Sequence, residues 1–139
     1  MAGLLRTADL AGYRSDPVYI RRSMHVPPRY EAVRDCMPAF FDLLRDEPEP
    51  AVRIVLGHFV FVYVHPYMDG NGRMGRFLMN VMLAAGGYPW TVVPLEKRDA
   101  YMAALESASL DQDIVPFASF LGRLVSDSLE GKRVPQLPS

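Results

Sequence analysis

An apolar segment at residues 51–64 sets the strongest limit on how this chain can fold. Valine, isoleucine, phenylalanine and tyrosine dominate the segment, and these residues favour strands. However, the segment is long for a strand and has no turn signal, and apolar side chains on every face are typical of a fully buried helix. Gly57 and His58 interrupt the apolar run, which is shorter than the ~20 residues that cross a bilayer. The segment therefore predicts a central helix that the rest of the chain covers.

A helix is also predicted before this segment. Apolar residues recur at spacings of three and four from Pro28 onward, and proline suits a helix start. Pro38 should bend or interrupt this helix, and the acidic, proline-containing residues 46–50 should end it. The stripe consists of Val33, Met37, Phe40, Phe41 and Leu44.

Three more helices are predicted after residue 76, over residues 94–107, and from Asp113, which can cap the last one. Gly86-Gly87 and Gly131 supply stop signals for the first and last of them. The stripes are Phe77, Leu78, Val81, Met82 and Ala85; Leu95, Tyr101, Met102 and Leu105; and Phe117, Phe120, Leu121, Leu124 and Val125. The fold class expected is all-α, a compact helical bundle.

Residues 12–28, called the flap below, break the helical pattern. Ser15-Asp16-Pro17 is a turn signal between short β-prone pieces. The flap is therefore predicted to be a small, exposed β-hairpin before the central helices. With it, residues 1–131 form one domain, and residues 132–139 form a loose C-terminal tail.

Composition narrows the partners and the compartment. The 139 residues include 15 basic and 16 acidic ones, so the net charge of −1 gives no electrostatic footprint for nucleic acid. The single cysteine, Cys36, cannot form an internal disulfide, and the N-terminus lacks the apolar core of a signal peptide. We expect no membrane association and a cytoplasmic location by default, which leaves delivery as a secreted effector open.

The chemistry is concentrated between the central helix and the next one. Gly70-Asn71-Gly72 opens a helix, where backbone N–H groups and the helix dipole favour an anion. The two glycines allow positive φ and a close approach of ligand to main chain, and Asn71 tolerates the same conformations. This segment predicts an anion cradle.

Four charged or titratable side chains flank the cradle. Arg73 and Arg76 are three residues apart on one helix face and could grip two successive phosphates. Asp69 is a suitable ligand for a Mg²⁺ ion that bridges phosphates. His65 can serve as a base at neutral pH. Taken singly, each feature is also common in purely structural roles.

Together, residues 65–76 read His-Pro-Tyr-Met-Asp-Gly-Asn-Gly-Arg-Met-Gly-Arg and resemble the Fic signature HPFx(D/E)GNGRxxR. The run agrees at every fixed position except Tyr67, where phenylalanine is usual and an aromatic anchor is kept. The likeness covers roughly residues 8–125. Beyond the motif it rests on Gly12-Tyr13-Arg14, Pro17-Val18-Tyr19, His25-Val26-Pro27-Pro28 and the apolar helix before His65.

The resemblance implies transfer of AMP from ATP to a Ser, Thr or Tyr hydroxyl of a protein, with release of pyrophosphate. It implies that His65 takes the hydroxyl proton, that Asp69 holds Mg²⁺, and that Gly70, Asn71 and Gly72 bind the α- and β-phosphates. Arg73 would then contact the β-phosphate and Arg76 the γ-phosphate. The flap would pair with an extended segment of the target protein, and its docking residues would be Tyr13, Val18, Tyr19 and Ile20.

Regulation can also be considered from the resemblance. Many Fic proteins carry a helix with the pattern Ser/Thr-x-x-x-Glu-Gly/Asn. Its glutamate pairs with the second motif arginine, here Arg76, and blocks the γ-phosphate site. Ser126 and Glu130, followed by Gly131, match this short pattern, although a glutamate before glycine also describes an ordinary helix end. The sequence leaves the oligomeric state open, as well as the presence of an upstream helix of which Leu4–Leu10 could be part.

Two other functions remain compatible with the sequence. One is a related transfer with the same loop, namely removal of AMP or transfer of phosphate or phosphocholine. The intact Gly70-Asn71-Gly72 favours AMP transfer, because the Doc-type kinases usually disrupt it. The other is a catalytically silent module that binds nucleotide or protein.

Overall fold

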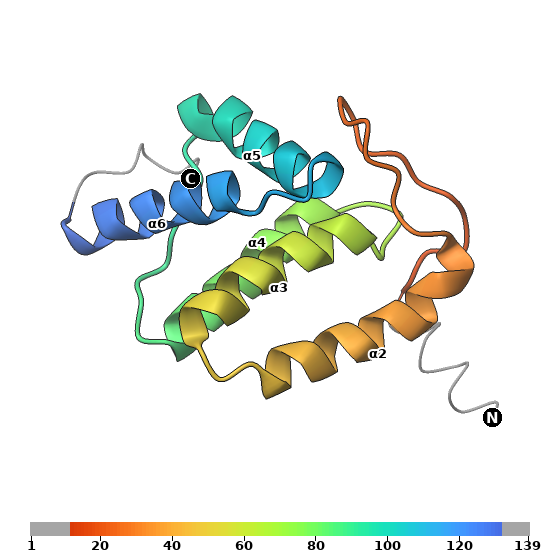
Figure 1. Cartoon of the computed structure of the whole chain (residues 1–139), viewed down its shortest axis with the longest axis horizontal. Helices are drawn as coiled ribbons and strands as arrows, with labels where there is room; N and C mark the ends of the chain where they lie inside the picture. Colours follow the sequence, from red (N-terminus) through yellow and green to blue (C-terminus); the bar gives the residue numbers. More distant parts are fainter. Residues whose placement is uncertain (1–11, 132–139) are drawn as a thin grey trace.

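The structure of the chain, a computed structural model, describes residues 12–131. These residues form five α-helices and one 3-10 helix, and none of them lies in a β-strand (Figure 1). The elements are α2 (Tyr30–Asp46), α3 (Pro50–Val64), α4 (Asn71–Ala85), η1 (Leu95–Lys97), α5 (Arg98–Leu110) and α6 (Val115–Leu129). The all-helical fold class is confirmed. The predicted tail at 132–139 and the segment Leu4–Leu10 lie outside the described residues.

Helix α3 is the centre of the fold, as its apolar sequence predicts. It contacts α2, α4, α5 and α6, and Figure 1 shows α3 and α4 side by side with α2 on one side and α5 and α6 on the other. One core cluster lies between α2 and α3 around Val33, Met37 and Phe61. A second joins α3 and α4 to α5 and α6 around Phe117 and Leu83.

Glycines let α3 and α4 approach closely. A Cβ added to Gly57 on α3 would lie 2.5 Å from the Met82 side chain of α4. A Cβ on Gly75 of α4 would lie 3.1 Å from Val62 and 3.4 Å from the His58 ring of α3. This close packing fixes the positions of the end of α3 and the start of α4, between which the motif lies.

The predicted β-hairpin in the flap is wrong. Residues 12–29 are extended or bent without strand pairing. Pro17, Pro27 and Pro28 have no N–H groups to donate across a hairpin. Other N–H groups bond elsewhere: that of Arg14 to the Pro66 carbonyl at 2.8 Å and that of Met24 to the Glu106 carboxylate at 2.8 Å.

The predicted interruption of the first helix at Pro38 is also wrong, since α2 continues through it. Pro38 is exposed, so its ring displaces no core side chain, while Met37 and Phe40 stay buried on the inner face. Phe41, predicted in the apolar stripe, is 47% exposed.

The buried face of α4 differs from the predicted stripe. Phe77 and Val81 are exposed, while the buried positions are Asn71, Gly75, Met79, Asn80 and Leu83. The true face contains a glycine and two asparagines, so its apolar signal is weak. The end of the helix is as predicted: Gly87 has φ +85°, and the Tyr88 N–H donates to the Leu83 carbonyl at 2.8 Å.

The last two helices follow their sequence signals in part. Leu95 and Met102 are exposed, whereas Tyr101 and Leu105 are buried. All five predicted apolar residues of α6 are buried, and the Asp113 carboxylate accepts a hydrogen bond from the Val115 N–H. Among residues 12–131, no helix has the length and apolarity needed to span a membrane.

Candidate functional site

The motif begins where α3 ends. His65 is the C-cap residue of α3 and has a left-handed conformation, with φ 51° and ψ 62°. The adjacent Pro66 is buried, and the peptide carbonyls of Val64 and His65 face Arg14. A non-glycine residue in this conformation needs support from its surroundings.

Arg14 provides that support. Its Nε donates to the His65 carbonyl at 2.7 Å, and a terminal nitrogen donates to the Val64 carbonyl at 3.1 Å and also to the Pro28 carbonyl. The residue is only 4% exposed, and its positive charge lies at the negative end of the α3 dipole. From the sequence, Arg14 is only part of the resemblance at residues 12–14, although the geometry of His65 depends on it.

The geometry of His65 suits a proton acceptor. Its Nδ1 lies 3.2 Å from the Val62 carbonyl, so this nitrogen carries the proton and Nε2 keeps its lone pair. Burial lowers the pKa of His65 below its ordinary value; the Val62 hydrogen bond opposes this shift, and the charges of Arg14 and His25 add to it. The imidazole is therefore neutral at pH 7 and remains a base at somewhat lower pH.

Asn71 closes the loop between His65 and α4. It is 2% exposed, its amide oxygen accepts the Tyr67 N–H at 2.8 Å, and its amide nitrogen donates to the Tyr67 carbonyl at 2.7 Å. The side chain is thus committed to the loop, and it is the backbone that faces a ligand. Gly70 is the N-cap of α4 with φ +75°, and no side chain caps the helix. The first N–H groups of α4 are consequently available for an anion.

A pocket of about 710 Å³ lies at this end of α4. Asp69, Gly70 and Arg73 line it together with hydrophobic side chains, so the predicted metal ligand, the first residue of the predicted cradle and the first arginine share one pocket, whereas His65, Asn71 and Gly72 are not part of its lining. The full lining is Gly12, Tyr67, Met68, Asp69, Gly70, Arg73, Met74 and Phe77.

Arg76 lies apart from this lining. It is half-buried, and its Nη1 lies 3.2 Å from the position that a Cβ on Gly72 would take. The side chain therefore bends back over the first turn of α4. Of the two motif arginines, Arg73 lines the pocket, whereas Arg76 packs over Gly72.

The flap lies beside the motif and is held at several points. The Tyr13 and Tyr67 rings are 5.8 Å apart, and burial raises the pKa of Tyr13, with a smaller contribution from Tyr67. The buried His25 ring is 2.9 Å from the Tyr63 carbonyl. Of the other predicted docking residues, Tyr19 is 81% exposed, while Val18 and Ile20 are half-buried.

Glu106 on α5 is a further anchor of the flap. Its carboxylate accepts the Ser23 hydroxyl at 2.5 Å and the Met24 N–H at 2.8 Å. Sequence reasoning missed Glu106 because more than 80 residues separate it from its partners. No local pattern marks such a contact.

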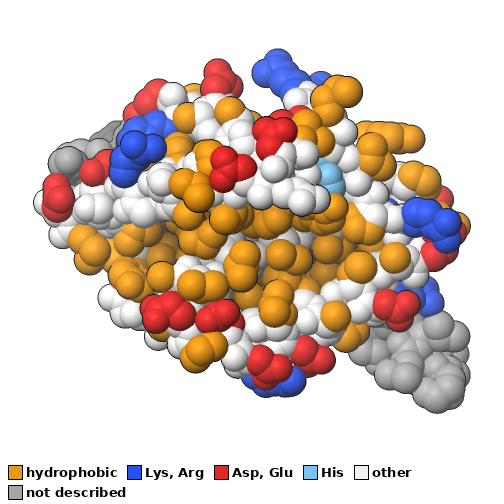
Figure 2. All heavy atoms as spheres, viewed as in Figure 1, with side chains coloured by type: hydrophobic (Ala, Val, Ile, Leu, Met, Phe, Trp, Pro, Cys, Tyr) orange, Lys and Arg blue, Asp and Glu red, His pale blue; other side chains and the backbone are white. Residues whose placement is uncertain are grey.

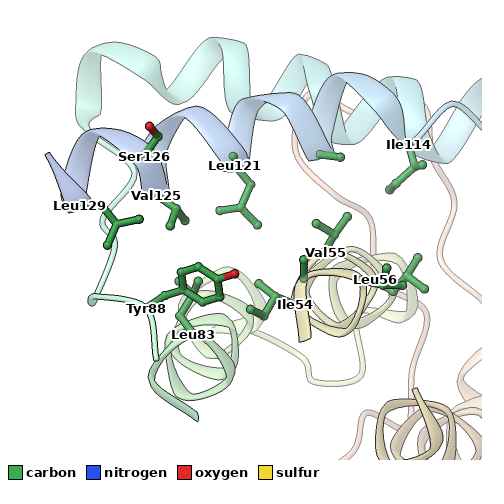
Figure 3. A pocket seen from close by; sticks show the side chains of 14 residues that line it. Ile54, Val55, Leu56, Leu83, Tyr88, Ile114, Leu121, Val125, Ser126 and Leu129 are labelled. Carbon is green, nitrogen blue, oxygen red and sulfur yellow. The ribbon is translucent and has the colours of Figure 1, made fainter. Parts of the chain in front are cut away.

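Glu130 is the C-cap residue of α6, and Ser126 lies one turn before it. Ser126 and Leu129 line an apolar groove of about 560 Å³ with Leu83 and other side chains of α3, α4 and α6 (Figure 3). This groove lies toward the C-terminal end of α4, whereas Arg76 is near its N-terminus. The Ser126 hydroxyl donates to the Glu130 carboxylate at 3.4 Å. In the view of Figure 2, hydrophobic side chains gather across the middle of the molecule.

Known proteins resemble the chain over most of its length. The chain is 38% identical over 122 residues to "Protein adenylyltransferase Fic" of Nematostella vectensis, covering 85% of the chain and 28% of that protein. It is 34% identical over 121 residues to "Protein adenylyltransferase fic-1" of Caenorhabditis elegans, covering 84% and 23%. The chain thus spans about a quarter of the length of these curated relatives.

Solved structures share the fold. Fic-1 of C. elegans superposes with a TM-score of 0.77 and 30% identity, covering 87% of this chain and 36% of that one. A Fic family protein of Desulfovibrio desulfuricans G20 superposes with a TM-score of 0.74 and 29% identity, covering 98% and 48%.

The family model described as Fic/DOC matches residues 3–83, which is more than half of the chain. The chain therefore belongs to the Fic/DOC family. The likeness inferred from residues 65–76 is confirmed.

Proposed function

We propose that this chain transfers AMP from ATP to a hydroxyl of a protein and releases pyrophosphate. The observation that carries the proposal is a neutral His65 at the end of α3, with Nε2 unprotonated, joined to the uncapped N-terminus of α4 by a short loop that Asn71 closes. A base next to an anion cradle is the arrangement that a hydroxyl attack on a phosphate requires. The names of the relatives, which are protein adenylyltransferases, favour the same reaction.

The residues divide the work as follows. His65 Nε2 accepts the proton of the attacking hydroxyl. The N–H groups of Gly70, Asn71 and Gly72 stabilise the charge that develops on the transferred phosphate. Arg73 binds the β-phosphate and Arg76 the γ-phosphate, which together with the preorganised loop orients the leaving pyrophosphate.

Asp69 fits a Mg²⁺ ion that is held mainly by the nucleotide. Its carboxylate is exposed and lies in the pocket beside Gly70 and Arg73. The described part of the chain contains no cluster of three or more acidic, histidine or cysteine side chains that could hold a metal by itself. Mg²⁺ commonly binds through one or two carboxylates and substrate phosphates, and when bound it would neutralise phosphate charge.

The flap is the proposed docking surface for the target protein. Tyr19, Met24 and Val26 are between 68% and 81% exposed, and they belong to a segment without helix or strand that Arg14 and His25 bond to the end of α3. Tyr13 and the half-buried Val18 and Ile20 support this backbone. An extended target segment could pair with it through main-chain hydrogen bonds and so present a hydroxyl without strong sequence preference.

The decisive experiment is incubation of the chain with Mg²⁺, α-labelled ATP and candidate proteins, with auto-modification as a first readout. His65→Asn removes the base but tolerates the left-handed backbone, and we expect it to lower transfer by about 10²–10⁴-fold. Gln112, which also has positive φ (55°) and lies far along the chain, gives a matched control as Gln112→Asn. Transfer that survives His65→Asn would contradict the role of His65.

The same experiment separates AMP transfer from its alternatives. Label from the α-phosphate appears on protein only if AMP is transferred, whereas γ-labelled ATP reports a kinase. Intact mass spectrometry of the product distinguishes a nucleotide from a phosphate or phosphocholine. A chain that binds ATP but labels nothing would support the silent binding module.

Restraint by Glu130 requires that residue to reach Arg76 from the other end of α4. Because Ser126 and Leu129, which lie before Glu130 in the chain, line the groove beside Leu83 toward the C-terminal end of α4, we expect Glu130→Gly to leave auto-modification with labelled ATP unchanged. A clear increase in labelling would show instead that Glu130 does restrain the site.

A further inference from the structure

A buried polar chain crosses three helices beneath the motif. His58 on α3 is fully buried, and its Nδ1 lies 2.9 Å from the Gly75 carbonyl of α4. Its Nε2 lies 2.6 Å from the hydroxyl of Tyr101 on α5. Because a carbonyl only accepts, Nδ1 carries the proton, and Nε2 must accept the proton of the Tyr101 hydroxyl.

The protonation state of His58 keeps these directions fixed. Burial lowers the pKa of His58 to about 4, which the hydrogen bond to Gly75 opposes and the charge of Arg76 reinforces. The imidazole is therefore neutral over the physiological range and has one donor and one acceptor. Tyr101, 4% exposed, has its own proton engaged with His58, so its oxygen can serve only as an acceptor for other neighbours.

Arg76 is a neighbour that donates a hydrogen bond to the Tyr101 oxygen. It directly follows Gly75, whose carbonyl is held by His58, and its guanidinium bends back over Gly72. Burial raises the pKa of Tyr101, while the charge of Arg76 and its hydrogen bond to the phenol oppose the rise. The guanidinium is thus placed between the cradle on one side and the Tyr101 oxygen on the other.

We propose that Tyr101, oriented by His58, is a positioning residue that holds the Arg76 guanidinium over the start of α4 for the third phosphate of a nucleoside triphosphate. The inference rests on the proposed function in taking Arg76 as the γ-phosphate ligand. Tyr101 touches no substrate itself. Its effect is selectivity for a triphosphate over a diphosphate, because only the triphosphate has the group that Arg76 reaches.

The test measures binding of ATP and of ADP, each with Mg²⁺, by calorimetry. Tyr101→Phe removes only the oxygen, and we expect it to weaken ATP binding by roughly three- to tenfold, the scale of the net contribution of one ordinary hydrogen bond. ADP binding should stay within about twofold of wild type. Tyr88→Phe is the matched control, since Tyr88 is a half-buried tyrosine in the groove beyond the other end of α4 and should change neither affinity.

Two more variants separate positioning from general stability. In an Arg76→Ala background, Tyr101→Phe should have no further effect on ATP binding, because the residue it positions is gone. His58→Leu keeps the Tyr101 hydroxyl but removes its anchor, and it should give a smaller loss of ATP selectivity. This variant also decides the matter if Tyr101→Phe does not fold.

Several results would overturn the proposal. They are an equal loss of ATP and ADP affinity in Tyr101→Phe, no loss of either, or a wild-type chain without preference for ATP. AMP transfer is a separate readout: selective ATP binding without AMP transfer would contradict the proposed function alone. AMP transfer with unchanged ATP selectivity in Tyr101→Phe would contradict the positioning role alone.

Discussion

The motif loop at residues 65–70 and the flap at residues 12–28 are both irregular, but they differ in how closely the rest of the structure holds them. The loop lies between two closely packed helices, and the buried Asn71 joins both sides of it through the main chain of Tyr67. The flap touches the core at Arg14 and His25 and through the Glu106 carboxylate, and its intervening side chains are largely exposed. One region is rigidly constrained, and the other is attached at points.

This difference follows from what each region is proposed to bind. Phosphates and a reacting hydroxyl require donors that are placed before the ligand arrives, because reorganisation would weaken transition-state stabilisation. A segment that pairs with many target proteins benefits from a main chain that can adjust. Arg14 serves both regions, since it belongs to the flap and bonds the carbonyls at the end of α3.

The largest effect on stability should come from replacing Arg14. Arg14→Ala leaves the carbonyls of Val64, His65 and Pro28 without their donor, and unsatisfied buried groups cost about 1–3 kcal/mol each. We expect the free energy of unfolding, measured with urea, to fall by more than about 3 kcal/mol.

A matched control for Arg14 is available in the same region. Arg29 lies at the end of the flap, its side chain is 85% exposed, and it pairs only loosely with Glu31 at 3.6 Å. Arg29→Ala should change stability by less than about 0.5 kcal/mol. Equal effects of the two substitutions would show that the flap and the loop are not coupled through Arg14.

A slightly smaller effect should appear as a pH dependence of stability. It tests the packing of α3 against α4, which holds the motif loop in place. His58 has a folded-state pKa of about 4 against an ordinary value of 6.5, so the unfolded chain binds its proton first as pH falls. Stability is therefore fully present above about pH 6.5 and is lost toward pH 4, by roughly 3 kcal/mol in all.

His58→Leu provides the comparison for this pH dependence. The variant cannot titrate at this position, so its free energy of unfolding should fall less between pH 6.5 and pH 4 than that of the wild type. If the free energy of unfolding changes equally with pH in the two proteins, the loss of stability at low pH does not come from His58.

The sequence predicted the rigid region far better than the flap, for a physical reason. The central helix and the motif are encoded by residues that are neighbours in the chain. Within the motif, Gly70 is the glycine that takes the positive φ before α4. The conformation of the flap depends on contacts such as Ser23 with Glu106, which join residues far apart in the chain. Propensity alone favoured a hairpin, and tertiary contacts together with prolines prevented it.

Side-chain directions were also harder to predict than helices. The buried face of α4 includes Gly75 and Asn80, because close packing and the hydrogen bonds to Thr91 replace apolar contacts there. A search for hydrophobic periodicity cannot find such a face. Likewise, the motif does not indicate that the Asn71 side chain bonds the main chain of Tyr67 and so shapes the loop.

Asn71→Ala should therefore act mainly on the loop, with a cost of about 2 kcal/mol for the two lost hydrogen bonds to Tyr67. Amide hydrogen exchange at Tyr67 should accelerate, and nucleotide binding should weaken as the cradle loses its shape. Asp69→Asn, an exposed neighbour, should leave stability within about 0.5 kcal/mol of wild type. Unchanged exchange at Tyr67 would contradict the view that Asn71 makes the loop rigid.

The smallest effect on stability is expected at the attachment of the flap to α5. Glu106→Gln keeps the shape of the side chain but replaces one of the two oxygens that accept from Ser23 and Met24. Since the contact is partly exposed, the free energy of unfolding should change by about 1 kcal/mol or less. Hydrogen exchange at the Met24 amide should nevertheless accelerate, and exchange at Tyr67 should not.

Glu96→Gln on the exposed η1 segment is the control, and it should affect neither amide. If Glu106→Gln also accelerates exchange at Tyr67, the flap and the loop form one cooperative unit and the contrast between them fails. If only Met24 responds, the two regions are separable, and transfer to a protein target should then fall while ATP binding stays unchanged. In that case Glu106 sets where the target backbone lies relative to His65, and Asn71 and Arg14 set where the chemistry occurs.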